Sequence, residues 1–430
     1  MTDRRVLSHV LRRLTYGPTA AEVDAAVRAG LGATVDRVLA AAPVPDLPDL
    51  GPDPVGALPK GASREQRQQA RAEVPEQTAE AVWWWVSRMV TAGDTAAERL
   101  TFFWHGHWAT SVQKVRSAQL MLGQQQTLRR YGAGSTGPLV RAMLRDPALI
   151  LWLDGQRNTA KAPNENLARE VMELFTLGVG HYTEDDVKAA ARVLTGWVVD
   201  RAKGSSRLAP GRHDKAAVTL LGQSGTPDLD GFADLLVRHP AHLPFLAGRV
   251  WQRYGSAEAP PAATTAAMVA AGPSVPAMLR ALSLDPGFPA TTGHLVKQPV
   301  EWIAGALRQL SVDPAKLGDK QRKQVQTAFR ALGQMPLRPP SVGGWPTGAA
   351  WLTTASAQAR LRTGQALAAM APGAVATLAD AAAGDRLDAL ARLLVVDAWT
   401  DRTAAVLTPA AAHPDRLLAL GLATPEYTVQ

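Results

Sequence analysis

Apolar residues recur at intervals of three and four along most of the chain. Val23, Val27, Leu31 and Val35 form one such series. This spacing puts the apolar side chains on one face of an α-helix. Sustained alternation of Val, Ile, Thr and Tyr is almost absent, and the high alanine content also favours helix. The pattern predicts an all-α fold in which residues 1–430 form a single, orthogonally packed, multi-helix domain.

Three segments interrupt the helical pattern. Residues 42–61 contain six prolines, residues 203–230 are rich in Gly, Pro and Ser, and residues 338–346 combine Pro, Gly and Trp. Proline and glycine at this density favour loops. We expect the first two segments to be surface insertions of the same domain, with one possible β-hairpin in residues 203–230. Residues 372–430 are predicted to be the helical C-terminal part of that domain.

Composition and charge exclude several classes of function. The chain has no cysteine, so disulfides, thiolate metal sites and a cysteine nucleophile are excluded. The 46 Lys and Arg against 38 Asp and Glu give a net charge of +8, but they are scattered, which does not favour nucleic-acid binding. No apolar stretch approaches the ~20 residues that span a bilayer. Because no apolar segment follows Met1–Arg5 either, the sequence predicts a cytoplasmic protein.

The first candidate for chemistry is a histidine pair in an aromatic segment. His105 and His107 lie on either side of Gly106, with Trp104 and Trp108 beside them. In a continuous α-helix the two rings diverge, but a bend at Gly106 would let both bind one metal ion. The alternative is a buried aromatic helix whose histidines form hydrogen bonds with their neighbours.

The second candidate is a helix predicted over residues 164–178, from Asn164 as N-cap to Gly178 as C-cap. Asn166, Glu170 and Glu173 share one face of this helix. Two carboxylates on one face can bind a cation or share a proton. The alternative is a structural network of ion pairs.

That network would centre on Arg169, paired with Glu165 or Glu173. After this helix, Thr183 and Asp186 resemble a capping box, which predicts the start of another helix.

Two loops complete the candidate segments. His213 and Asp214 lie in a polar loop, where Asp214 could orient His213 for acid–base chemistry. Trp345, in the Pro- and Gly-rich segment 339–348, could form the wall of a pocket or anchor the loop on the core.

Together these segments resemble the bacterial DUF1800 family, whose function is unknown. The matching segments cover almost the whole chain: residues 11–19, 103–107, 164–178, 182–184, 194–197, 296–302, 339–345 and 420–427. The sequence departs from the family pattern after Asp214, where Ala216 and Val218 replace a Gly and a Lys.

The resemblance implies that ten residues at motif positions form one site: His105, His107, Asn164, Glu165, Asn166, Arg169, Glu170, Glu173, His213 and Asp214. It also implies a possible DUF1501-type protein partner. Many members of the family look exported, in contrast to the cytoplasmic location expected here.

The leading hypothesis is a metal-dependent enzyme, oxidative or hydrolytic, acting on an unknown small molecule or peptide. His105, His107 and Glu170 would hold iron, manganese, copper or zinc. Glu173 would act as general base, and Arg169 would bind an anionic substrate. His213 and Asp214 would form an acid–base pair. The residues around the cofactor would be Trp104, Asn166 and Trp345.

Two alternatives stay open. The lesser one is a haem-binding, peroxidase-like protein, because a buried His, an Arg and a Glu in a helical protein suit haem. The other is a non-catalytic, α-helical binding or assembly protein with a buried polar network.

The metal hypothesis predicts that protein purified without a His-tag or chelator carries near-stoichiometric iron, manganese, copper or zinc. Alanine at His105, His107 or Glu170 should then remove a ligand and lower the bound metal, measured by elemental mass spectrometry. Unchanged metal content in all three variants would contradict the assignment of these ligands.

Overall fold

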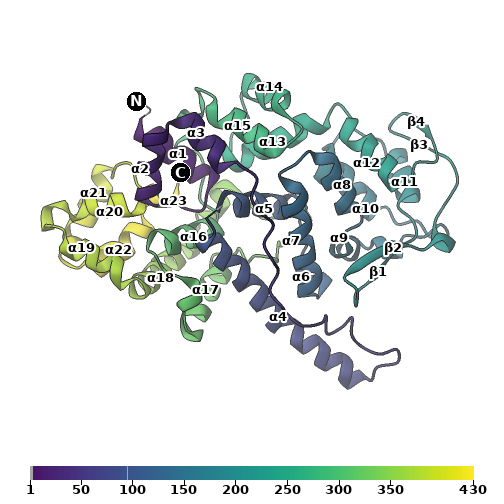
Figure 1. The fold of residues 1–430 in the computed structure, drawn as a ribbon, viewed down its shortest axis with the longest axis horizontal. Coiled ribbons are helices and arrows are strands. Elements are labelled where there is room, and N and C mark those ends of the chain that lie inside the picture. The colour runs from purple at the N-terminus through teal and green to yellow at the C-terminus, as the bar shows by residue number, and fades with distance from the viewer. Residues whose placement is uncertain (1–2, 94) are drawn as a thin grey trace.

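The computed structural model describes residues 3–93 and 95–430, and the fold is mainly α-helical, as the sequence predicts (Figure 1). The helices of the first half are α1 (Arg4–Leu14), α2 (Ala20–Ala29), α3 (Leu31–Val38), α4 (Arg64–Thr91), α5 (Thr95–His107), α6 (Val112–Val115), α7 (Ala118–Gly132), α8 (Thr136–Leu144), α9 (Pro147–Trp152), α10 (Asn166–Glu170) and α11 (Glu184–Val193). The capping box predicted from Thr183 and Asp186 is confirmed at the start of α11.

Helices also form most of the second half of the chain. They are α12 (Leu229–Arg238), α13 (His242–Tyr254), α14 (Ala262–Ala271), α15 (Val275–Leu284), α16 (Pro299–Gln309), α17 (Asp319–Ala331), α18 (Thr354–Met370), α19 (Pro372–Asp380), α20 (Arg386–Leu394), α21 (Asp401–Leu407), α22 (Pro414–Ala423) and α23 (Pro425–Thr428). Residues 372–430 are therefore helical, as expected, and α22 packs along α18. In the described part of the chain, no helix combines the length and the apolar character needed to cross a membrane.

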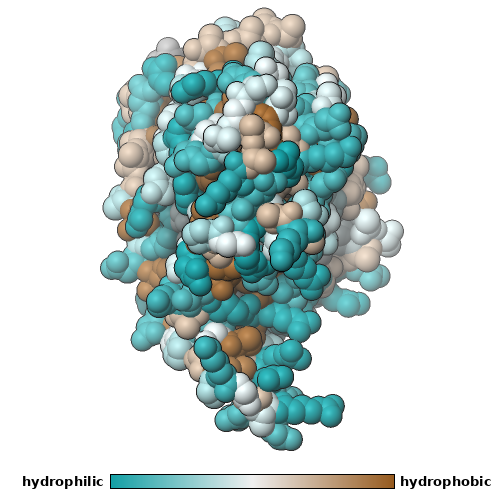
Figure 2. Space-filling view, turned by 90° about the vertical axis from the view of Figure 1, so that its right-hand side faces the viewer, coloured by the Kyte–Doolittle hydropathy of each residue, from teal (hydrophilic) through white to brown (hydrophobic). Residues whose placement is uncertain are grey.

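Two small β-hairpins lie at one end of the molecule, where the sequence predicts one. Strand β1 (Trp197–Asp200) pairs antiparallel with β2 (Ser205–Leu208), and β3 (Val218–Leu220) with β4 (Gln223–Gly225). The additional hairpin begins before residue 203, because Trp197–Asp200 supplies its first strand. The face that carries α11, α12 and the hairpins is mostly hydrophilic (Figure 2).

Helix α5 lies near the centre of the molecule, between two hydrophobic cores (Figure 1). Phe102 belongs to the core formed with α4, α16, α17, α18 and α22, whereas Phe103 and Trp104 belong to the core formed with α7, α8, α11, α12, α13 and α15. A helix that is apolar on several sides must be buried on several sides. The aromatic segment around His105 and His107, predicted as a site, therefore also packs against both cores and connects them.

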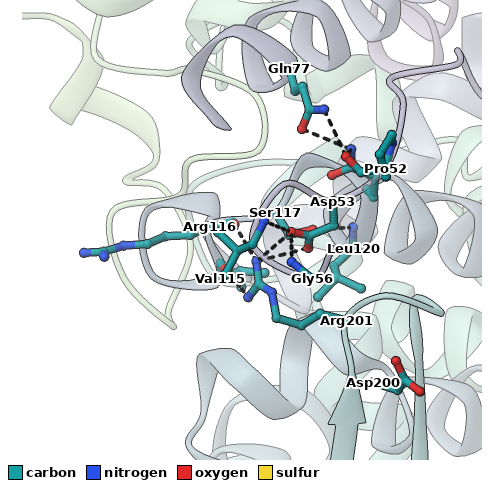
Figure 3. A network of polar contacts seen from close by, with 12 residues as sticks. Pro52, Asp53, Gly56, Gln77, Val115, Arg116, Ser117, Leu120, Asp200 and Arg201 are labelled. Atoms are coloured by element: carbon teal, nitrogen blue, oxygen red, sulfur yellow. Dashed lines mark hydrogen bonds and ion pairs between the residues drawn. The ribbon is translucent and has the colours of Figure 1, made fainter. Parts of the chain in front are cut away.

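The proline-rich segment 42–61 packs on the body beside α4, whose N-terminal half projects away from the rest of the molecule (Figure 1). Buried Asp53 anchors this segment, because its carboxylate pairs with Arg201 at 3.1 Å (Figure 3). Arg201 also donates to the carbonyl oxygens of Val115 and Arg116, at 2.9 and 2.6 Å. One guanidinium thus connects the segment, the turn between β1 and β2, and α6.

Removing this guanidinium leaves a buried carboxylate without its cation. We expect Arg201→Ala to lower the free energy of unfolding by about 1–3 kcal/mol and to speed amide hydrogen exchange in residues 50–57. Lys203→Ala is the matched control, because Lys203 is 79% exposed and lies 3.8 Å from Asp200. Equal effects of the two substitutions, measured by urea unfolding and hydrogen exchange, would contradict the anchoring role.

Candidate functional site

The two candidate histidines lie on a continuous helix and point in different directions. Helix α5 runs through Gly106 to His107 without the bend that a shared metal ion requires. Successive positions on a helix rotate by about 100°, so positions two apart lie on opposite sides. Of the two alternatives, the structure therefore has the continuous buried helix and no bend at Gly106, because packing between two cores keeps the helix regular.

His105 is completely buried in an aromatic cage. Its ring lies 5.3 Å from the rings of Trp85 and Trp345 and 6.1 Å from that of Phe102, between centroids. Neither ring nitrogen has a hydrogen-bond partner within residues 3–93 and 95–430. Burial, and then the charge of Arg129, lowers the pKa of His105 to about 3. His105 is thus a neutral ring that fills the core.

His107 has one nitrogen engaged and one free for another partner. Its Nε2 lies 2.8 Å from the carbonyl oxygen of Phe175. Because a carbonyl can only accept, Nε2 carries the proton and Nδ1 keeps a lone pair. That Nδ1 is buried and has no donor in the described part of the protein. Burial, and then the charge of Arg249, lowers the pKa of His107 to about 3, so the ring is neutral.

The carboxylate candidates lie on a helix that changes its register. The predicted helix 164–178 starts as α10 at Asn166 and continues as a π-helix over Val171–Thr176, where the amide of Leu177 donates to Met172, five residues earlier. A wider turn of this kind is frequent at functional sites. It changes the face that the carboxylates share.

Two of the charged side chains on this helix are engaged by neighbours. Glu173 accepts from the hydroxyl of Tyr182 at 2.5 Å, and Arg169 pairs with Glu184 at 2.7 Å and Glu165 at 3.1 Å. Half-buried Glu170 has a raised pKa, because of burial and the charge of Glu173.

The amide of Asn166 donates to the carbonyl oxygen of Leu153 at 3.2 Å. Among the described residues, no group of three or more His, Asp or Glu side chains is arranged to hold a metal ion. The structure therefore does not assemble His105, His107 and Glu170 into one coordination shell.

The His213 loop is tied to the end of α11. His213 Nδ1 lies 3.0 Å from the carbonyl oxygen of Thr195, and Asp214 pairs with Arg192 at 2.7 Å. Gly196 makes this possible, because a Cβ there would lie 3.0 Å from the His213 amide nitrogen. Asp214 is thus oriented by Arg192, and it does not hold His213.

The segment around Trp345 does converge with the histidine segment. A Cβ on Gly344, which has φ +86°, would lie 2.6 Å from the carbonyl oxygen of Gly106, so the loop packs directly on the α5 backbone. The ring of Trp345 stacks on Phe102 at 5.2 Å. Trp104 instead donates from Nε1 to Gly132 at 2.8 Å, and it anchors the end of α7.

A small pocket opens where this loop meets α5 and α13, at the start of α16. Its volume is about 60 Å³. The walls combine aromatic rings, glutamines and arginines: Phe102, Phe103, Gly106, His107, Arg249, Gln252, Arg253, Gln298, Gly343, Trp345 and Thr347. We call it the α5–α13 pocket. Asn166, Arg169, Glu170, Glu173, His213 and Asp214 are not among its walls.

The α5–α13 pocket is rich in positive charge. Arg253 pairs with buried Glu301, which also binds Arg99 at 3.0 Å. Half-buried Arg249 has no hydrogen-bond or ion-pair partner among the described side chains, and burial lowers its pKa. Glu301 therefore pairs with two guanidinium groups, those of Arg99 and Arg253, and Arg249 adds a further positive charge to the walls of the pocket.

The sequence motifs did not point to Arg249 and Arg253, the two arginines that line the pocket. Arg249 and Arg253 lie one turn apart on α13, and Glu301 lies in an apolar stretch of α16. A charged residue inside an apolar helical stretch is a usable signal, because such residues are rarely buried without a partner. Pairing Glu301 with Arg99 across 202 positions, however, has no local signature.

Comparison with known proteins gives one match. A family model described as a protein of unknown function, DUF1800, matches residues 9–429. No curated protein and no solved structure matches the chain. The family model thus agrees with the resemblance drawn from the motifs, and it assigns no activity to the pocket.

The buried state of His105 predicts a pH effect on stability. Since its pKa is about 3 in the folded protein and about 6.5 in the unfolded chain, unfolding takes up a proton between these values and stability falls as the pH drops below about 6.5. We expect His105→Phe to match the parent protein at pH 7.5 and to be about 2 kcal/mol more stable at pH 4.5, measured by urea unfolding.

The matched control is His413→Phe, at an exposed position. It makes the same substitution on an exposed ring and therefore measures the effect of losing a histidine outside the aromatic cage. If His105→Phe is instead destabilised equally at both pH values, the ring has a role beyond filling the aromatic cage.

Proposed function

The chain belongs to the DUF1800 family, and we propose that it binds a small organic anion in the α5–α13 pocket. The observation that carries this proposal is Arg249, a half-buried guanidinium without a carboxylate partner among the described residues. Its nitrogens remain within reach of solvent, because none of them is among the fully buried atoms without a partner. A carboxylate or phosphate entering the pocket would replace that water and pair with the positive charge.

Two further donors lie just behind the pocket wall. Arg253 Nη2 and Trp345 Nε1 are covered by protein and have no acceptor among the described residues, so a small movement of the wall would bring them to a ligand. More than nine in ten buried polar groups in proteins have a partner, so unfilled donors beside a cavity point to a ligand or to water. Guanidinium groups bind carboxylates with short, charge-assisted hydrogen bonds.

His107 refines the chemistry of this ligand. Its Nδ1 can only accept, because Nε2 holds the proton against the Phe175 carbonyl oxygen. Nδ1 is covered by protein, so the proposal includes a small opening of the pocket wall that lets a hydroxyl or amino group of the ligand donate to it. The volume of about 60 Å³ limits the ligand to a few non-hydrogen atoms. A short hydroxy acid or amino acid has both groups.

The metal-dependent enzyme stays a second prediction. His107 favours it in one respect, because a ring held by a carbonyl oxygen at Nε2 presents Nδ1 as a metal ligand. The charge of Arg249 opposes a cation at that position. A cytoplasmic location and assembly with a DUF1501-type protein also stay predictions of the sequence.

The proposal predicts that lactate binds at least tenfold more tightly than propionate, because only lactate offers a hydroxyl to His107 Nδ1. Arg249→Gln should weaken both ligands by roughly 10- to 100-fold, through loss of the charge-assisted bond. Arg330→Gln, at an exposed position on α17, should change neither. Isothermal titration calorimetry on the parent protein and on both variants measures the affinities for lactate and propionate.

His107→Phe should bring the two affinities together, because it removes the acceptor. If neither acid binds, or if Arg249→Gln binds both unchanged, the anion pocket is wrong. A stoichiometric metal that is lost in His107→Ala and retained in Arg249→Gln would favour the metal-dependent enzyme instead.

A further inference from the structure

Helices α17 and α18 lie beside each other at the edge of the molecule, and an open groove of about 910 Å³ runs between them (Figure 1). Its wall residues recur at intervals of three and four along each helix, from Lys320 to Ala331 on α17 and from Ala355 to Met370 on α18. With a rise of 1.5 Å per residue, the groove is roughly 16–22 Å long. We call it the α17–α18 groove.

The floor of the groove is apolar and is made mostly of small side chains. Val325 and Leu367 are buried there, and Met370 is a flexible side chain that adapts to different partners. The other apolar residues are alanines, which leave room above the backbones of both helices: Ala328, Ala331, Ala355, Ala359 and Ala366. A long groove with such a floor suits a third helix that brings large apolar side chains of its own.

The charged residues of the groove are all cations. Lys320, Lys323 and Arg362 are exposed on its walls, and no Asp or Glu is among the described residues of these walls. None of the three side chains has a hydrogen-bond or ion-pair partner within the described chain. The hollow beside α1 and α21, by contrast, has Asp397 and Glu426 among its walls together with arginines. The α17–α18 groove therefore favours a partner that carries negative charge.

We infer that the α17–α18 groove binds an amphipathic helix of another protein, with large apolar residues on one face and Asp or Glu along its flanks. The apolar residues, spaced three and four apart, would lie on the alanine floor, while the carboxylates reach Lys320, Lys323 and Arg362. A recessed floor between two helices suits a single helix better than a flat membrane surface. The groove shares no wall residue with the α5–α13 pocket, so this inference does not depend on the function proposed there.

The probe is a fluorescein-labelled peptide of about 15 residues, with leucine along one helical face and glutamate and alanine on the other. Fluorescence anisotropy on the full chain should show one saturable site, with at least tenfold weaker binding when lysine replaces glutamate in the peptide, because like charges repel. The double variant Lys320→Gln, Lys323→Gln should weaken the glutamate peptide about three- to tenfold. Arg330→Gln is the matched control, because Arg330 is exposed on the same helix outside the groove.

A second pair of variants tests the apolar floor. Ala355→Glu places a carboxylate at an exposed floor position in the first turn of α18, where negative charge is compatible with the helix, and should weaken the glutamate peptide at least tenfold. Ala369→Glu, exposed on the same helix outside the groove, should bind normally. Circular dichroism establishes that both variants are folded. Arg249→Gln should also bind the peptide normally, which separates the groove from the α5–α13 pocket.

Three results would overturn the inference. They are the absence of saturable binding of the glutamate peptide, equal binding of the lysine peptide, and unchanged affinity in a folded Ala355→Glu protein. Co-sedimentation with phosphatidylglycerol vesicles tests the other source of negative charge. Binding to these vesicles without binding of the glutamate peptide would assign the groove to a membrane surface instead.

Discussion

The ion pairs of helix α5 hold the structure together. Arg99 binds the buried carboxylate of Glu301 on α16, which also takes Arg253 from α13. The preceding residue, Glu98, takes Arg88 from α4 and Arg129 from α7. Two neighbouring residues thus connect α5 to four other helices. Removing one partner of such a buried pair typically lowers stability by about 3–5 kcal/mol.

These ion pairs also decide the geometry of the candidate site. Because α5 is held straight between two cores, His105 turns into an aromatic cage and His107 turns toward Phe175 and the pocket. A bend would join the histidines but would pull one of them out of its core. The neutral state of both rings follows from burial, and it makes His107 an acceptor toward the pocket.

Positive charge is the main feature of the α5–α13 pocket. Arg249 and Arg253 line it, and the Glu301 carboxylate already pairs with Arg253 and Arg99. Arg249 has no hydrogen-bond or ion-pair partner among the described residues. Partial desolvation strengthens the attraction of such a group for an anion, and this is the reason for proposing an anionic ligand there.

The sequence by itself determined the helical class and the capping box at Thr183, because these depend on local periodicity and cap chemistry. It predicted one hairpin where the structure has two, and it left open whether the chain bends at Gly106. Only the tertiary structure decided that Arg249 lacks a partner within the described chain, that Arg99 meets Glu301, that the loop of Trp345 packs on α5, and that His105, His107 and Glu170 form no common coordination shell. Partners hundreds of residues apart are chosen by packing, and no local pattern encodes that choice.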